Sequence, residues 1–89
     1  MITKAQHNAT YRKILPLLKK MREDAGLNQR ALGWELRKPQ SWVSRTEIGE
    51  RRIDVLEFAA WASACGVDPV QALKVVARFV AEASVPNHA

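Results

Sequence analysis

Four polar side chains near the middle of the chain could together hydrogen-bond to the edges of DNA bases. If Val43 points into the protein, a rotation of about 100° per helical residue places Ser41 and Arg45 on the opposite side. Gln40 and Ser44 flank that side. A glutamine amide can pair with N6 and N7 of adenine, and an arginine can bind guanine or a phosphate. These four side chains therefore form a candidate surface for contacts with a nucleic acid.

Two short helices and a tight corner must hold these side chains in place. The sequence from Gln29 to Gly49 predicts such a pair, with Leu32, Leu36 and Val43 as its apolar anchor. Gly33 lacks a side chain and would let the two helices press together. A second helix with a polar and basic outer face is shaped to enter a nucleic-acid groove.

The rest of the sequence predicts helices and no strands. Apolar residues recur at helical spacing over 9–25, 29–36, 39–48, 55–64 and 69–83. Capping residues, prolines and glycines mark the helix ends: Gly26, Asn28, Pro39 in a first turn, Gly49, Asp54 with Glu57, Gly66, and Asp68 with Pro69. The expected fold is all-α.

Length and charge limit the class of protein. The 89 residues allow one domain, expected at 9–83 between flexible termini at 1–8 and 84–89. Residues 1–52 carry twelve lysines or arginines against five acids, a net charge of +7, whereas residues 53–89 carry two against four, a net charge of −2. A positive field around the helical pair suits a polyanionic partner. The alternative is an ordinary solvated basic surface.

The cysteine content and hydropathy favour a soluble cytoplasmic protein. Cys65 is the only cysteine, which excludes an intrachain disulfide and fits a reducing compartment. The first residues lack the apolar run of a signal peptide, and no segment approaches the roughly 18 apolar residues that span a bilayer.

From about Leu18 to Pro69, the sequence resembles the lambda-repressor-like helix-turn-helix family, also called the XRE family. The matching positions are Arg22, Gly26, Leu27, Asn28, Gln29, Leu32, Gly33, Ser41, Val43, Ser44, Glu47, Gly49, Gly66 and Val67. The resemblance implies a compact five-helix lambda-repressor-like domain whose second and third helices form the helix-turn-helix. It also implies sequence-specific binding to double-stranded DNA by a transcriptional repressor or regulator.

The resemblance also assigns roles to residues on and around the recognition helix. It implies that Gln40, Ser41, Ser44 and Arg45 read base edges in the major groove. Contacts with the DNA backbone are expected from Asn28, Gln29, Lys38, Trp42, Arg51 and Arg52. Gln29 could instead be a plain helix-opening residue, and the two loop arginines could be ordinary solvated side chains. Trp42 could also pack near Trp34 or stay exposed. Arg22 and Glu47 match the partly buried ion pair that fixes the recognition helix on its scaffold.

Four positions depart from the family pattern. Arg37 replaces the usual corner glycine, Lys38 an often apolar residue, and Thr46 the apolar residue before the glutamate. We expect Arg37 to adopt a left-handed backbone at some cost, or to reshape the turn. Gly33 replaces alanine and lowers helix propensity by about 1 kcal/mol.

The last helix has more apolar residues than one face needs. An inner stripe is expected from Val70, Leu73, Val76, Ala77 and Val80. Val75 and Phe79 would then be exposed surplus and are our candidates for a homodimer interface. The alternative is that they pack back on the first helix.

Catalysis has little support in the sequence. His7 and His88 lie in expected termini, and no metal-ligand spacing or nucleophile motif occurs, so we predict no enzyme activity, cofactor or metal. The alternative function is a protein-interaction module, such as an antitoxin, that uses the same helical scaffold on a toxin or another regulator.

Overall fold

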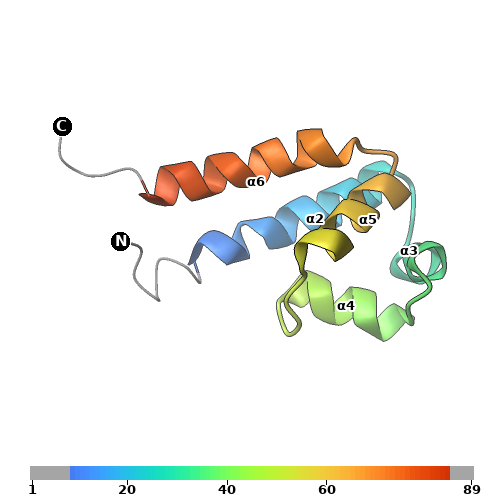
Figure 1. Ribbon diagram of the computed structural model, residues 1–89. Coiled ribbons are helices and arrows are strands. Elements are labelled where there is room, and N and C mark those ends of the chain that lie inside the picture. The colour runs from blue at the N-terminus through green and yellow to red at the C-terminus, as the bar shows by residue number, and fades with distance from the viewer. Residues whose placement is uncertain (1–8, 85–89) are drawn as a thin grey trace.

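The structure is a computed structural model and describes residues 9–84. Its helices are α2 (Ile14–Asp24), α3 (Gln29–Leu36), α4 (Gln40–Ile48), α5 (Val55–Ala64) and α6 (Pro69–Ser84), and this part of the chain contains no strand. The α3–α4 pair lies at one end of the molecule, and α6 packs on α5 along the other side (Figure 1). The expected all-α fold with five helices is therefore confirmed.

The first helix begins later than the expected start at residue 9. Residues 9–12 form a separate helical turn, Lys13 lies in a turn, and α2 begins at Ile14. Pro16 explains the break, because it has no N–H to donate to the carbonyl of Arg12 and its ring would clash with that carbonyl. At the other end of the chain, α6 extends to Ser84, where a tail was expected to begin.

The corner between α3 and α4 is a tight turn. Asn28 caps α3 by accepting a hydrogen bond from the Ala31 amide at 2.8 Å. Arg37 ends the helix in the left-handed conformation, with φ 56° and ψ 43°. This is one of the two outcomes expected from the sequence, the other being a reshaped turn. The next amide, that of Lys38, donates to the Gly33 carbonyl at 2.8 Å. Pro39 lies just before α4, with an extended ψ of 157°, and not in its first turn, because the chain must leave the corner extended.

Leu18, Leu32, Val43 and Trp61 are fully buried and form the centre of the core. The Trp61 indole N–H donates to the Leu18 carbonyl at 3.1 Å, which joins α5 to α2. Thr46 is also fully buried, and its hydroxyl donates to the Trp42 carbonyl at 2.6 Å. A threonine is therefore tolerated where the family pattern has an apolar residue, because its polar group is satisfied.

The last two helices begin as the sequence predicts. Asp54 and Glu57 form a capping box, with each side chain accepting a hydrogen bond from the other's backbone N–H. Asp68 accepts from the Val70 amide at 2.9 Å, and Pro69 is the first residue of α6. These local bonds satisfy amides that would otherwise lack partners.

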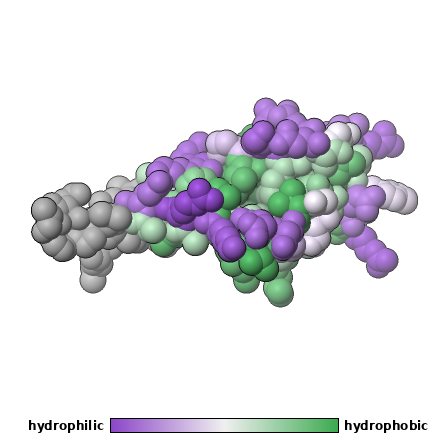
Figure 2. Space-filling model, turned by 90° about the horizontal axis from the view of Figure 1, so that it is seen from above, coloured by the Kyte–Doolittle hydropathy of each residue, from purple (hydrophilic) through white to green (hydrophobic). Residues whose placement is uncertain are grey.

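The buried face of α6 differs from the expected one. Ala72 is buried and Val76 packs against the core, while Val75 and Phe79 are half-buried. The exposed surplus consists of Val70, Leu73, Ala77 and Val80. The face was misassigned because apolar residues occupy most of the helix circumference. Seen from the side of α6, apolar and polar side chains lie next to each other on the surface (Figure 2).

Phe79 is held by the first part of the chain. The Lys13 ammonium lies 6.0 Å from the centre of the Phe79 ring and 3.9 Å from the Glu82 carboxylate. The expectation that Phe79 is exposed is therefore wrong, and its partial burial agrees with the alternative of packing on the N-terminal helical region.

Candidate nucleic-acid interface

The outer face of α4 carries the four residues expected to read bases. Gln40, Ser41 and Arg45 are exposed and Ser44 is half-buried. Val43, on the opposite face, is fully buried between α4 and the core. The structure therefore brings these four side chains together on one outward surface. Pro39 before the helix has no side-chain acceptor, which leaves the first amides of α4 without a side-chain cap.

A polar network anchors the inner side of α4. The Arg22 guanidinium donates to both carboxylate oxygens of Glu47, at 2.5 Å from Nε and 3.1 Å from Nη2, and to the Leu27 carbonyl at 2.9 Å. The side chains of Arg22 and Glu47 are only 10% and 4% exposed. Glu47 raises the pKa of Arg22, chiefly through this hydrogen bond. Arg22 is therefore charged at neutral pH and paired with Glu47.

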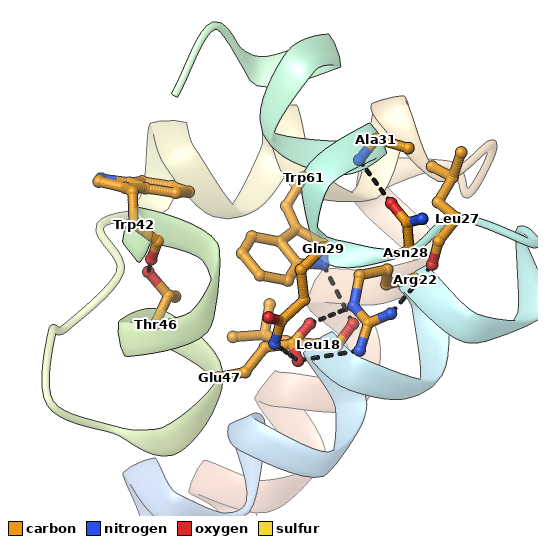
Figure 3. A network of polar contacts seen from close by, with 10 residues as sticks. All are labelled: Leu18, Arg22, Leu27, Asn28, Gln29, Ala31, Trp42, Thr46, Glu47 and Trp61. Carbon is orange, nitrogen blue, oxygen red and sulfur yellow. Dashed lines mark hydrogen bonds and ion pairs between the residues drawn. The ribbon is translucent and has the colours of Figure 1, made fainter. Parts of the chain in front are cut away.

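Gln29 belongs to the same network, which the sequence did not reveal. Its Nε2 donates to Oε1 of Glu47 at 3.0 Å, so a single carboxylate joins α2, α3 and α4 (Figure 3). A nearly buried carboxylate needs several hydrogen-bond donors, and this requirement is the signal from which a second donor to Glu47 could have been predicted. The side-chain amide of Gln29 has two N–H donors, and the bond to Glu47 uses one of them, so the second can donate elsewhere.

Trp42 lies on the flank of α4 and packs against the core. Its ring is tilted by 37° on the Trp61 ring, with 6.1 Å between the ring centres (Figure 3). Lys38 and Arg51 lie over it, with the ammonium at 5.4 Å and the guanidinium at 4.4 Å from its centre. Packing near Trp34 is not observed, because Trp34 is 84% exposed.

The loop after α4 holds its two arginines in different ways. Arg51 donates to both Glu57 oxygens, at 3.1 and 2.7 Å, and lowers the pKa of that carboxyl. The Arg52 guanidinium lies 4.1 Å from the centre of the Tyr11 ring, and the Tyr11 hydroxyl accepts from the Ile53 amide at 2.8 Å. Arg52 is exposed, whereas Arg51 is half-buried.

Two further observations concern other kinds of site. Burial raises the pKa of the Cys65 thiol to about 11, so this thiol is protonated at neutral pH. Within residues 9–84, no group of three or more His, Cys, Asp or Glu side chains could hold a metal ion, and no helix is long and apolar enough to cross a membrane. His7 and His88 lie outside the described residues.

Comparison with known proteins identifies a family and a similar solved structure. Residues 17–73 match the sequence model of a protein family described as a helix-turn-helix domain. A solved structure, an XRE-family like protein from Pseudomonas syringae pv. tomato str. DC3000, is 42% identical, covers 85% of this chain and 93% of its own, and superimposes with a TM-score of 0.79. The chain belongs to the XRE-type helix-turn-helix family. Among curated protein sequences, none matches it.

Membership of the XRE family identifies α3 and α4 as the helix-turn-helix and DNA as the class of partner. Two departures from the XRE pattern now have a physical account. A β-carbon on Gly33 would lie 2.6 Å from the Lys38 carbonyl oxygen, so this form of the corner requires glycine there. Arg37 takes the left-handed position that the family usually gives to glycine.

Proposed function

We propose that this XRE-family protein is a sequence-specific transcriptional regulator, most simply a repressor, that reads the major groove with α4. Gln40, Ser41, Ser44 and Arg45 would contact base edges. The observation that carries the proposal is the position of α4, whose polar face is outward while Glu47 fixes its inner side to α2 and α3.

Contacts with the DNA backbone would surround this face. The proposed residues are Asn28, Gln29, Lys38, Trp42, Arg51 and Arg52. Gln29 would use its second N–H and the start of α3, where helical amides attract an anion. Arg52 is exposed, while Arg51 already pairs with Glu57, so Arg52 would supply more of the electrostatic attraction. Binding to DNA would place the protein in the cytoplasm with the genome.

Selection of bound duplexes from a random DNA pool tests the proposal. The parent protein should enrich one sequence, and Gln40→Ala and Arg45→Ala should each relax the preference at one or two base pairs, costing roughly 1–3 kcal/mol of discrimination. Arg78→Ala, an exposed arginine on α6, is the matched control and should leave the preference unchanged. No enrichment by the parent, or unchanged preferences in both α4 variants, would refute base reading by α4.

We also propose a homodimer, and we place its interface on the exposed apolar residues of α6 instead of on the half-buried Val75 and Phe79. The exposed residues Val70, Leu73, Ala77 and Val80 follow the 3–4–3 spacing of a helix seam. Leu73 also lines an apolar groove of about 230 Å³ with Val55 and Phe58. An exposed apolar patch of this kind suits a second copy of the chain, which would place two α4 helices roughly 34 Å apart on an inverted repeat.

The exposure of Trp34 supports the second candidate, binding to a protein such as a toxin or another regulator. Tryptophan is enriched among the residues that dominate protein interfaces, and 84% exposure leaves this ring without an intramolecular role. Gel shifts in rising salt separate the candidates, since binding through several phosphates must weaken steeply with salt. Binding to a protein at high salt, without binding to any DNA pool, would favour the second candidate.

A further inference from the structure

We propose that Trp42 is a positioning residue for phosphate binding, whose ring holds the Lys38 ammonium where it can contact the DNA backbone. This inference rests on the proposed function, because it concerns how the same interface is built. It distinguishes two of the proposed backbone residues by their main role: Lys38 contacts the phosphate, and Arg51 chiefly fixes the loop.

The ring of Trp42 is itself fixed by the core. It packs on Trp61, which is fully buried and donates a hydrogen bond to the Leu18 carbonyl at 3.1 Å. The Trp42 carbonyl accepts from the buried Thr46 hydroxyl at 2.6 Å. Figure 3 shows the Trp42 ring projecting from α4, with Trp61 lying between it and α2. A group held on this ring is therefore placed relative to the whole scaffold.

The two cations on the ring come from opposite ends of α4. Lys38 precedes the helix and Arg51 follows it, with distances of 5.4 and 4.4 Å to the ring centre. Both lie within the range of about 6 Å in which a cation is attracted to an aromatic face. One side chain thus joins the corner before α4 to the loop after it.

The surroundings of the two cations differ. Arg51 is paired with Glu57, whose capping box fixes it to the start of α5, so its charge is largely neutralised. Lys38 is exposed, and no carboxylate of residues 9–84 lies within ion-pair distance of its ammonium. Lys38 contributes to lowering the pKa of Glu57 but forms no ion pair with it, so its ammonium stays available for a phosphate, while Arg51 holds the loop against the ring.

Ordering the Lys38 side chain before DNA binds increases the contribution of its phosphate contact to affinity. A lysine side chain has many rotamers, and ordering it at an interface costs conformational entropy. Contact with the Trp42 ring restricts those rotamers before binding. The expected consequence is higher affinity for any DNA sequence, with no effect on base preference, because phosphate contacts carry no direct sequence information.

Substitutions that keep or remove the aromatic face test this role. Trp42→Phe retains an aromatic face, whereas Trp42→Met removes it and leaves a side chain of moderate size. Dissociation constants are measured for the duplex recovered by the selection above, over a range of salt concentrations. Trp42→Met should weaken binding about threefold at low salt, the loss expected for an exposed cation–π contact, and should flatten the salt dependence. Trp42→Phe should stay close to the parent.

A double-mutant cycle assigns the effect to Lys38. In Lys38→Met, which removes the charge and keeps the length of the side chain, Trp42→Met should cause little further loss of affinity. An equal loss in both backgrounds would overturn the assignment, as would a changed base preference in Trp42→Met or parental affinity in that variant. Failure of the parent to bind any duplex would instead overturn the proposed function, and this inference with it.

Folding is checked in every variant by circular dichroism at the assay temperature. If Trp42→Met is unfolded there, Trp42→Tyr and Trp42→Leu replace the pair, since they preserve the same contrast between aromatic and aliphatic side chains. The same coupling with Lys38 is required of them.

Discussion

The Lys38 carbonyl oxygen lies 2.6 Å from the position that a β-carbon on Gly33 would occupy. Real β-carbons do not approach backbone oxygen so closely, so any side chain at position 33 must displace the corner between α3 and α4. The same two residues are joined by a hydrogen bond from the Lys38 amide to the Gly33 carbonyl, at 2.8 Å. The angle between the two helices therefore depends on this one glycine.

Gly33→Ala should destabilise the fold by roughly 1–3 kcal/mol. On helix propensity alone, the same change would stabilise a helix by about 1 kcal/mol, so the sign of the effect is diagnostic. Chemical unfolding measures the difference. Gln71→Ala, at an exposed position of α6, is the control and should have a small effect. A more stable Gly33→Ala variant would show that the corner yields easily.

Arg37→Gly should stabilise the fold by roughly 1 kcal/mol, because Arg37 has φ 56° and the left-handed conformation is costly for residues with a β-carbon. The same unfolding measurement applies. Arg30→Gly, within α3, should destabilise instead. Equal losses from both changes would mean that the backbone of Arg37 carries no strain.

Arg22→Ala should destabilise the fold by roughly 3 kcal/mol, because it leaves the Glu47 carboxylate nearly buried with only Gln29 as a donor. Thermal midpoints check this. Lys20→Ala breaks an exposed pair with Asp24 at 2.9 Å and should change stability by less than about 1 kcal/mol. Equal midpoints for Arg22→Ala and the parent would refute the anchoring role of the network.

Glu57 should contribute to the acid sensitivity of the fold. Arg51 lowers its pKa below 4.5, so the carboxylate stabilises the fold above pH 4.5, and that contribution is lost as the pH falls through the lowered value. Glu57→Gln should therefore lose less stability than the parent between pH 5 and pH 3. Asp24→Asn, in an exposed pair, is the control. Identical pH profiles for Glu57→Gln and the parent would contradict the assignment.

Leu73→Glu should prevent dimer formation and leave the monomer folded, because Leu73 is 46% exposed and lies in the proposed seam. Sedimentation velocity measures the oligomeric state. Gln71→Glu adds the same charge at another exposed position of α6 and should not change it. A monomeric parent would refute the proposed dimer.

Local chemistry made much of the fold predictable. Asn28, Asp54 with Glu57, and Asp68 with Pro69 define helix starts through bonds that span two or three residues, and these are legible in the sequence. Pro16 is equally visible in the sequence, but the start of α2 at Ile14 was not predicted from it.

Contacts between distant parts of the chain were harder to predict. Gln29 reaches Glu47 across 18 positions, and only the packing of α3 on α4 brings them together. The prediction of the buried face of α6 was wrong for a related reason. With apolar residues around most of its circumference, only the shape of α5 and α2 beneath it decides that Ala72 and Val76 face inward.

The network around Glu47 separates two tasks within one short helix. Its inner side carries the bonds that determine the tilt of α4, while the four outer side chains form no hydrogen bond or ion pair within residues 9–84. We therefore expect substitutions at the exposed positions 40, 41 and 45 to leave the architecture intact. Under the proposed function, related proteins would diversify their operators by altering these outer positions and keeping one carboxylate.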